Sequence, residues 1–225
     1  MKFILDTANI DQIRTCNEIF PISGVTSNPS IVKKEGRIDF LAHMNTIRSI
    51  IGPEKCLHVQ VSARDQAGML KDADAILSKI DRDVYVKVPV CLEGIAVIKA
   101  LKAKGVRVTA TGVMSSQQGL LALEAGADYI APYYNRMESM GIDACGVIGT
   151  MAEMIDRYQY PTVIVAASFR NAEQVMRAFL AGAQSVTLDP SILYAMVGHT
   201  FIPPVLDAFE ADWKSIYGDK TIADL

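Results

Sequence analysis

A lysine inside an alternating apolar run has the clearest capacity for chemistry in this sequence. In V-Y-V-K-V-P-V, at Val84–Val90, valines take every second position and separate Tyr85, Lys87 and Pro89. Successive side chains of a strand point to opposite faces, so the valines form one apolar face and Lys87 lies on the other. An amine that has lost its hydration favours its neutral form, which can attack a carbonyl carbon. A lysine that extends to solvent, or pairs with an acid such as Asp6, is the alternative interpretation.

The same alternation places polar side chains near the ends of the other strand-like runs. Asp6 could act as an ion-pair partner of Lys87 or as a group that accepts and donates protons. Buried hydroxyl and amide groups more often satisfy one another by hydrogen bonds, and a tyrosine often only fills space. The residues expected on the inner face are Asp6, Thr26, Gln60, Thr109, Thr111, Tyr133, Ser168 and Thr187. If they converge on one cavity, they form a polar site around the lysine.

Two arginines follow strand-like runs late in the chain. Tyr133–Arg136 has the sequence Y-Y-N-R, and Ala167–Arg170 has A-S-F-R. The planar guanidinium group suits bidentate contacts with phosphate or carboxylate oxygens, so both arginines are candidates for an oxyanion site. Helix capping or pairing with surface acids is the alternative role.

Eight short apolar or β-branched runs alternate with longer amphipathic stretches. Strands are expected near Phe3–Thr7, Gly24–Ser27, Leu57–Val61, Val84–Val90, Arg107–Val113, Tyr129–Tyr133, Thr162–Ser168 and Ser185–Asp189. Helices are expected at Asp65–Ile80, Leu92–Lys104, Ser115–Ala125 and Asn171–Ala181. Strand starts recur about every 26 residues, which fits eight βα units of a (β/α)8 barrel, a fold of about 250 residues. A doubly wound open sheet is the alternative, but it commonly has five or six strands.

The chain is expected to form one domain over residues 1–225, because no linker or low-complexity tract interrupts it. An additional helix is predicted at about residues 204–217, where Val205, Phe209, Trp213 and Ile216 recur at helical spacing. This helix could pack on its own barrel or on another subunit. In a (β/α)8 barrel the active site lies at the carboxyl ends of the strands, where the polar residues are expected.

Composition argues against several classes of partner and cofactor. The 22 Lys and Arg residues against 25 Asp and Glu residues give a net charge of −3, which argues against a nucleic-acid or anionic-membrane partner. No apolar run reaches the roughly 20 residues of a membrane span. The three histidines are scattered, and no G-x-G-x-x-G or Walker loop is present, so neither a metal site nor a nucleotide site is expected. Four distant cysteines without a C-x-x-C pair favour a reducing cytoplasm.

Motifs spread along the whole chain resemble those of the transaldolase family. They are F-I-L-D-T-A at Phe3–Ala8, G-V-T-S-N-P-S at Gly24–Ser30, V-K-V-P-V at Val86–Val90, A-P-Y-Y-N-R at Ala131–Arg136 and A-A-S-F-R at Ala166–Arg170. More narrowly, the chain is similar to the short subgroup of fructose-6-phosphate aldolases and transaldolase-like proteins. This resemblance implies a (β/α)8 barrel with a Schiff base on the fourth-strand lysine and no metal or other cofactor. It also implies homo-oligomers built from pentamers, often decamers.

The resemblance assigns roles residue by residue. It makes Lys87 the Schiff-base lysine and Asp6 the first-strand aspartate. Asn28 matches an asparagine that contacts substrate hydroxyls, and Thr26, in the same motif, is a further candidate for substrate binding.

The phosphate end is assigned in the same way. Arg136 and Ser168 match the residues that hold the sugar phosphate, and Arg170 stands where better-known aldolases have lysine.

Two positions favour the aldolase branch of the family. Gln60 and Tyr133 match the aldolases, whereas true transaldolases carry glutamate and phenylalanine there. In the aldolases, the counterparts of Gln60, Thr111 and Tyr133 hold a water molecule that moves protons. Gly112 and Met114 replace alanine and tyrosine of better-known aldolases, and Ser27 replaces a threonine. These three differences, together with Arg170 in place of lysine, bear on donor and acceptor preference.

The resemblance implies cleavage of fructose 6-phosphate to dihydroxyacetone and glyceraldehyde 3-phosphate, and the reverse aldol addition. Small sugar phosphates and dihydroxyacetone would be its binding partners. A transaldolase that transfers a dihydroxyacetone unit between sugar phosphates, in the pentose phosphate pathway, is the alternative. A phosphate-binding barrel isomerase and a barrel that only binds sugar phosphates are alternatives from other classes. Neither of these needs a buried nucleophilic lysine.

Overall fold

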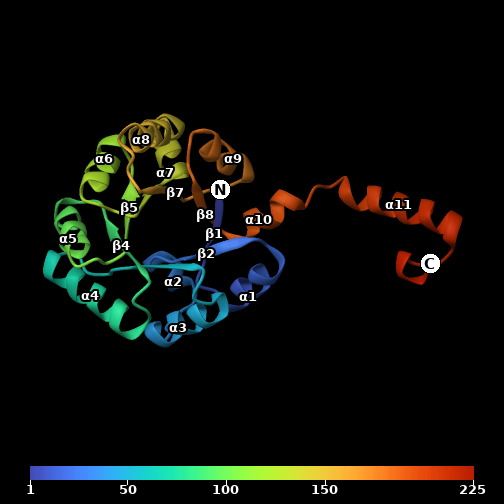
Figure 1. Cartoon of the computed structure of the whole chain (residues 1–225), viewed down its shortest axis with the longest axis horizontal. Coiled ribbons are helices and arrows are strands. Elements are labelled where there is room, and N and C mark those ends of the chain that lie inside the picture. The colour runs from blue at the N-terminus through green and yellow to red at the C-terminus, as the bar shows by residue number, and fades with distance from the viewer.

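Eight parallel strands close into a barrel in which each strand pairs with the next and β8 pairs with β1 (Figure 1). The computed structural model describes residues 1–225. The strands are β1 (Lys2–Asp6), β2 (Ile22–Thr26), β3 (Cys56–Gln60), β4 (Tyr85–Pro89), β5 (Val108–Val113), β6 (Tyr129–Pro132), β7 (Val163–Ala166) and β8 (Ser185–Leu188). The predicted (β/α)8 barrel is confirmed, and the doubly wound open sheet is excluded.

Helices surround the barrel, and their ends follow from capping side chains. They are α1 (Ile10–Ile19), α2 (Pro29–Lys34), α3 (Phe40–Ile51), α4 (Gln66–Lys79), α5 (Leu92–Ala103), α6 (Ser116–Glu124), α7 (Tyr134–Ser139), α8 (Ala144–Tyr158), α9 (Ala172–Leu180) and α10 (Pro190–Val197). Asp65, Ser115 and Asn171 each accept a hydrogen bond from the backbone N–H three residues later. These residues are therefore N-caps, and the predicted helices begin one residue after them.

The alternation of the strands separates two packed layers, as predicted. Val86 and Val88 are fully buried in the large core between the strands and the helices. Tyr85, on the opposite face of β4, packs instead against a small cluster inside the barrel. That cluster contains Ile4, Tyr129, Ala131 and Val165. Lys87 shares the face of Tyr85 and so points into the barrel.

Aromatic side chains fill the barrel below Lys87. The ring of His58 stacks on Tyr85 with centroids 4.7 Å apart and meets Tyr129 edge-on at 5.0 Å. His58 Nδ1 lies 2.8 Å from the hydroxyl of Thr109. Burial, and secondly the charge of Lys87, lower the pKa of His58 well below its usual value, so the ring is neutral. This His58–Tyr85–Tyr129 layer closes the lower barrel.

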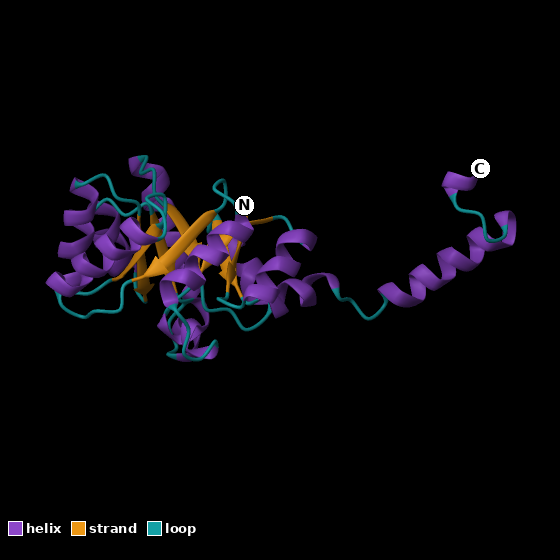
Figure 2. Ribbon diagram, turned by 90° about the horizontal axis from the view of Figure 1, so that it is seen from below, coloured by secondary structure: helices purple, strands orange, loops and turns teal.

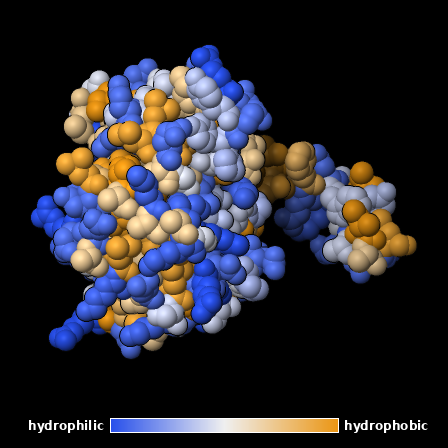
Figure 3. Space-filling model, turned by 60° about the vertical axis from the view of Figure 1, so that its left-hand side comes forward, coloured by the Kyte–Doolittle hydropathy of each residue, from blue (hydrophilic) through white to orange (hydrophobic).

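The predicted additional helix is present as α11 (Ile202–Tyr217), followed by the short 3₁₀ helix η1 (Ile222–Asp224). Figure 2 shows that α11 extends away from the barrel, and none of its residues is buried. Figure 3 shows apolar side chains, in orange, on the surface of this arm. The exposed apolar residues here are Phe201, Ile202, Val205, Leu206, Phe209, Ile216 and Tyr217. Of the two packing modes that the sequence leaves open, α11 does not adopt packing on its own barrel.

None of the helices, taken alone, combines the length and the apolar composition that a membrane span requires. The α10 segment and the segment Ile202–Asp224 reach that length and apolarity only together, and a bend of 46° separates them.

Candidate active site

A cavity of about 520 Å³ opens at the carboxyl ends of the strands. Every residue predicted for the site lines it except Thr26 and Thr111. The predicted residues in its wall are Asp6, Asn28, Gln60, Lys87, Tyr133, Arg136, Ser168 and Arg170. The structure therefore brings together residues that lie far apart in the sequence.

Lys87 is almost completely enclosed at the base of this cavity. Its side chain is 4% exposed, and Nζ donates a hydrogen bond to the carbonyl oxygen of Ser27 at 2.9 Å. Lys87 thus does not extend to solvent, and no ion pair joins it to Asp6. Burial lowers the pKa of Lys87 from its usual 10.5, although the nearby Asp6 charge opposes this shift. The amine is therefore more readily neutral than an exposed lysine.

Threonines of neighbouring strands hold Asp6 in place. Thr26 Oγ1 donates to Asp6 Oδ1 at 2.6 Å and lies 2.6 Å from Thr187 Oγ1. Burial raises the pKa of Asp6, although Lys87 and the bond from Thr26 act in the opposite direction. Asp6 can thus exchange a proton closer to neutrality than an exposed aspartate. Thr26 was expected to contact substrate, but it lies behind the carboxylate rather than in the cavity wall.

Gln60, at the end of β3, and Tyr133, which follows β6, present polar atoms to the cavity. The Tyr133 hydroxyl lies 3.1 Å from Thr111 Oγ1, which is buried behind it. Burial raises the pKa of Tyr133, so the phenol keeps its proton. Gln60 Oε1 is buried and has no hydrogen-bond partner in the chain. A water molecule or a substrate hydroxyl could satisfy this oxygen.

Cationic side chains gather at the opposite side of the cavity, beyond β6 and β7. Arg136, on α7, lies over the ring of Tyr133 with Cζ 5.2 Å from its centroid. Arg170, after β7, lines the same side, whereas Lys34, at the end of α2, lines the cavity near Asp6. None of the three cations forms an ion pair with another residue. The alternative that the arginines pair with surface acids is therefore wrong, and their charges are available to an anion.

Two backbone features shape the cavity wall. Ser168 adopts a left-handed conformation with φ of 65°, which is uncommon for a residue other than glycine and concentrates at functional sites. Asn28 caps α2, since its Oδ1 accepts from the backbone N–H groups of Ser30 and Ile31 at 2.9 and 3.1 Å. The amide nitrogen of Asn28 has no partner within the chain and can donate to a ligand.

Nearly the whole chain is similar to proteins of one known family. The family model described as transaldolase/fructose-6-phosphate aldolase matches residues 3–219. The chain belongs to this family. It is also 46% identical, over 99% of its length and 100% of the relative's, to a "Probable fructose-6-phosphate aldolase" of Streptococcus pneumoniae. The family membership predicted from the motifs is confirmed.

The backbone at Gly112 has a conformation that favours glycine. Gly112 has φ of 74°, and the pairing of β5 with β6 shifts register between Thr111 and Val113. Glycine adopts this left-handed conformation without strain, which alanine does not. The shift lies next to Thr111, the residue that contacts Tyr133.

Some residues of the cavity were not assigned to the site from the sequence. Thr187 was predicted to point inward, but its contact with Thr26 depends on the closure of the barrel. Asn135 lies between Tyr133 and Arg136 in the Y-Y-N-R motif, and that position was the available signal. No group of three or more His, Cys, Asp or Glu side chains is arranged to hold a metal ion.

Proposed function

We propose that this protein is a Schiff-base aldolase that cleaves fructose 6-phosphate to dihydroxyacetone and glyceraldehyde 3-phosphate and catalyses the reverse addition. The enclosed Lys87 amine, in a cavity whose far side carries unpaired cations, is the observation that carries this proposal. Family membership and the printed name of the Streptococcus pneumoniae relative support it. Gln60 and Tyr133 favour the aldolase over the transaldolase alternative.

The reaction begins at the neutral Lys87 amine. Its Nζ attacks C2 of the open-chain ketose and forms a carbinolamine, which loses one water molecule to become an iminium ion. The hydroxyl on C4 then gives up its proton, the C3–C4 bond breaks, and the bonding electrons move to the iminium nitrogen. Glyceraldehyde 3-phosphate leaves, and an enamine of dihydroxyacetone remains on the lysine.

Completion of the cycle needs one proton and one water molecule. The enamine carbon takes up the proton, and the water hydrolyses the iminium, which releases dihydroxyacetone and restores the amine. Asp6 is the proposed acid–base group beside the lysine, because its raised pKa eases proton exchange. Tyr133, with its hydroxyl near Thr111, and the unpartnered Gln60 oxygen are the groups proposed to hold the water.

The other end of the substrate faces the cationic side of the cavity. Arg136, Arg170 and Ser168 are proposed to bind the phosphate group, because charge-assisted hydrogen bonds to phosphate are strong. The free amide nitrogen of Asn28 is proposed to contact a hydroxyl of the sugar chain.

The chain is proposed to act as a homo-oligomer, a pentamer or decamer, in the cytoplasm, without a nucleic-acid or membrane partner. The apolar side chains of α11 support assembly, since monomers rarely expose contiguous apolar patches of this kind. The four unpaired cysteines support a reducing compartment. A monomer mass in light scattering of the intact chain at micromolar concentration would argue against the oligomer.

Covalent trapping tests the proposed reaction most directly. The protein is treated with borohydride in the presence of dihydroxyacetone, digested, and analysed by mass spectrometry. One dihydroxyacetone-derived adduct is expected on the peptide that contains Lys87, and none is expected in Lys87→Met. An isomerase or a simple binding protein gives no adduct at all. An adduct on another lysine would contradict the assignment of Lys87.

A further inference from the structure

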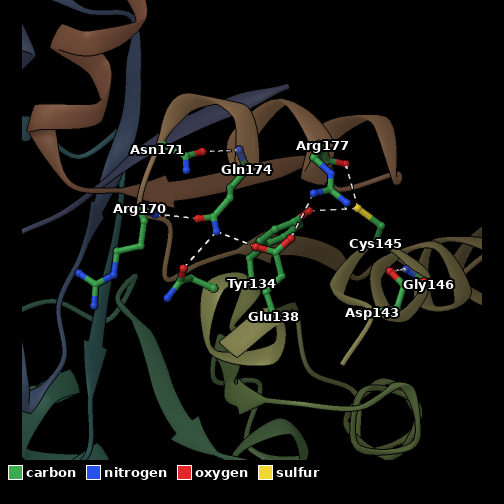
Figure 4. Close-up of polar contacts among 10 residues, drawn as sticks. Tyr134, Glu138, Asp143, Cys145, Gly146, Arg170, Asn171, Gln174 and Arg177 are labelled. Carbon is green, nitrogen blue, oxygen red and sulfur yellow. Dashed lines mark hydrogen bonds and ion pairs between the residues drawn. The ribbon is translucent and has the colours of Figure 1, made fainter. Parts of the chain in front are cut away.

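Gln174, which does not line the active-site cavity, joins the two segments that flank the cationic side of that cavity. It lies on α9 and is 8% exposed. Its Oε1 accepts from the backbone N–H of Arg170 at 2.8 Å, and its Nε2 donates to Asn135 Oδ1 at 3.1 Å and Glu138 Oε2 at 2.7 Å (Figure 4). The side-chain amide therefore bonds the loop after β7 on one side and α7 on the other.

The partners of Gln174 are themselves held in place. The second carboxylate oxygen of Glu138 accepts from Arg177 at 3.2 Å, so two side chains of α9, those of Gln174 and Arg177, bond to the same residue of α7. The backbone N–H of Asn135 donates to the carbonyl oxygen of Ser168 at 2.9 Å. Ser168 has the left-handed φ of 65°, a conformation that persists only where its surroundings hold it. The network thus holds Ser168 directly, through the bond from Asn135, and indirectly, through the bond from Arg170 two residues later.

Gln118 occupies the equivalent position on α6 but makes no hydrogen bond to a side chain of a neighbouring βα unit. Gln118 and Gln174 each lie three residues after the N-cap of their helix, and Gln118 Oε1 accepts from the N–H of Met114 at 2.8 Å, as Gln174 does from Arg170. The Gln118 amide nitrogen, however, has only the carbonyl oxygen of Val90 at 3.5 Å. The bond to the residue before the cap is common to both, whereas the bonds to side chains of a neighbouring βα unit belong to Gln174 alone.

We infer that Gln174 is a positioning residue that sets the distance between Arg136 on α7 and the Ser168–Arg170 loop, so that the oxyanion end is preformed for a phosphate monoester dianion. The inference rests on the proposed function for the identity of that end. The backbone N–H of Arg170 donates directly to Gln174, and Asn135, which accepts from Gln174, is the neighbour of Arg136 in the chain. The network therefore contacts one proposed phosphate-binding residue directly and the other through a single residue. A preformed site binds more tightly because less ordering accompanies binding.

The test compares Gln174→Met with Gln118→Met in the addition of dihydroxyacetone to two acceptors. Glyceraldehyde 3-phosphate carries the phosphate, and glyceraldehyde does not. Gln174→Met is expected to raise KM for the phosphorylated acceptor by roughly 5- to 30-fold, with little change in kcat and in KM for glyceraldehyde. Gln118→Met loses the equivalent capping bond and is expected to leave the ratio of the two KM values unchanged.

An exchange of residues supplies the rescue. Gln174→Glu alone sets a carboxylate against Glu138 and is expected to raise the same KM. With Glu138→Gln added, the amide at position 138 can donate to the carboxylate at position 174, so the KM ratio is expected to return toward the unmodified value. Melting temperatures of all variants show whether a merely structural loss accompanies the effect.

Arg136→Ala separates a failure of the proposed phosphate end from a failure of the positioning role of Gln174. If it does not change the KM ratio, the proposed phosphate end is wrong, and the inference falls with it. If Arg136→Ala changes the ratio but Gln174→Met does not, only the positioning role is overturned. An equal change in Gln118→Met, or no rescue by the exchange, also overturns that role.

Discussion

The two sides of the active-site cavity are built by different means. On one side, Asp6, Gln60 and Lys87 project from strands of the closed barrel, and Lys87 is almost fully buried. On the other side, Arg136 and Arg170 lie beyond the strands, on α7 and on a loop, and both are exposed. The first side changes the pKa values of its groups, while the second offers unpaired charges.

This difference follows from what each side is proposed to do. A nucleophilic amine must lose its hydration and its proton, which only a rigid, enclosed position provides. A phosphate-binding group must keep its charge and remain reachable, so it lies near solvent. The ladder of backbone hydrogen bonds holds the strand side, whereas side chains such as Gln174 hold the loop side.

Removal of the strand-side nucleophile is expected to have the largest effect. Lys87→Met should abolish cleavage of fructose 6-phosphate, because Lys87 is the only buried amine among the residues that line the cavity. The melting temperature should stay the same or rise, since the change removes a buried amine that has no ion-pair partner. Cleavage assays and thermal unfolding of the same preparation check both expectations. Retained turnover would contradict the proposal that the strand side of the cavity supplies the nucleophile.

Tyr133→Phe is expected to have the next largest effect and to separate lyase from transferase. Release of dihydroxyacetone needs a proton on the enamine carbon, whereas in transfer that carbon forms a bond to erythrose 4-phosphate instead; in both cases water then hydrolyses the iminium. General acid–base groups contribute roughly 10²–10⁴ in rate, so cleavage should fall by that factor and transfer by much less.

Tyr134→Phe is the matched control, because its hydroxyl is buried 3.1 Å from Cys145 rather than in the cavity. Free dihydroxyacetone is quantified in both reactions. Equal losses in cleavage and transfer would place Tyr133 in the shared bond-breaking step. An unmodified protein that transfers the unit but releases none would favour the transaldolase alternative.

On the loop side, Arg136→Ala should raise KM for phosphorylated acceptors by roughly 10- to 150-fold, the loss expected for a charge-assisted contact of about 1.5–3 kcal/mol. KM for unphosphorylated acceptors should change little. Arg157→Ala, which removes only an exposed ion pair with Glu153, provides the control. Similar losses for both kinds of acceptor would indicate that Arg136 is structural.

The smallest expected effect is a shift in the pH dependence of Schiff-base formation. The lowered pKa of Lys87 means that Schiff-base formation rises with pH through a limb that lies below 10.5, the usual value for lysine. Asp6→Asn removes a charge that favours the ammonium form, so the limb should move to still lower pH. The rate of trapping by borohydride, measured against pH, reports the position of the limb independently of its height. A limb at or above the usual lysine value would contradict the strand-side environment.

Much of the strand side could be predicted from the sequence, because alternation within a strand decides which face a side chain occupies. The position of Lys87 opposite the valines is the clearest case. Alternation does not decide depth, and so Thr26 and Thr111 were expected in the site but lie behind Asp6 and Tyr133.

The loop side was less predictable. The contacts of Gln174 with Asn135 and Glu138 join residues more than 30 positions apart, and no local pattern encodes them. The arm formed by α11 shows the same limit, because helical spacing predicts the helix but not the surface that it contacts.

The His58–Tyr85–Tyr129 layer has a consequence for the order of events in the cavity. Because packed rings close the lower barrel, molecules can enter and leave only through the opening at the carboxyl ends of the strands. In the proposed reaction, the fragment bound to Lys87 is deepest, and the phosphorylated fragment lies between it and solvent. The proposed reaction is therefore sequential: the aldehyde must leave through this opening before water or a second aldehyde can reach the enamine, so the geometry and the proposed covalent chemistry impose the same order.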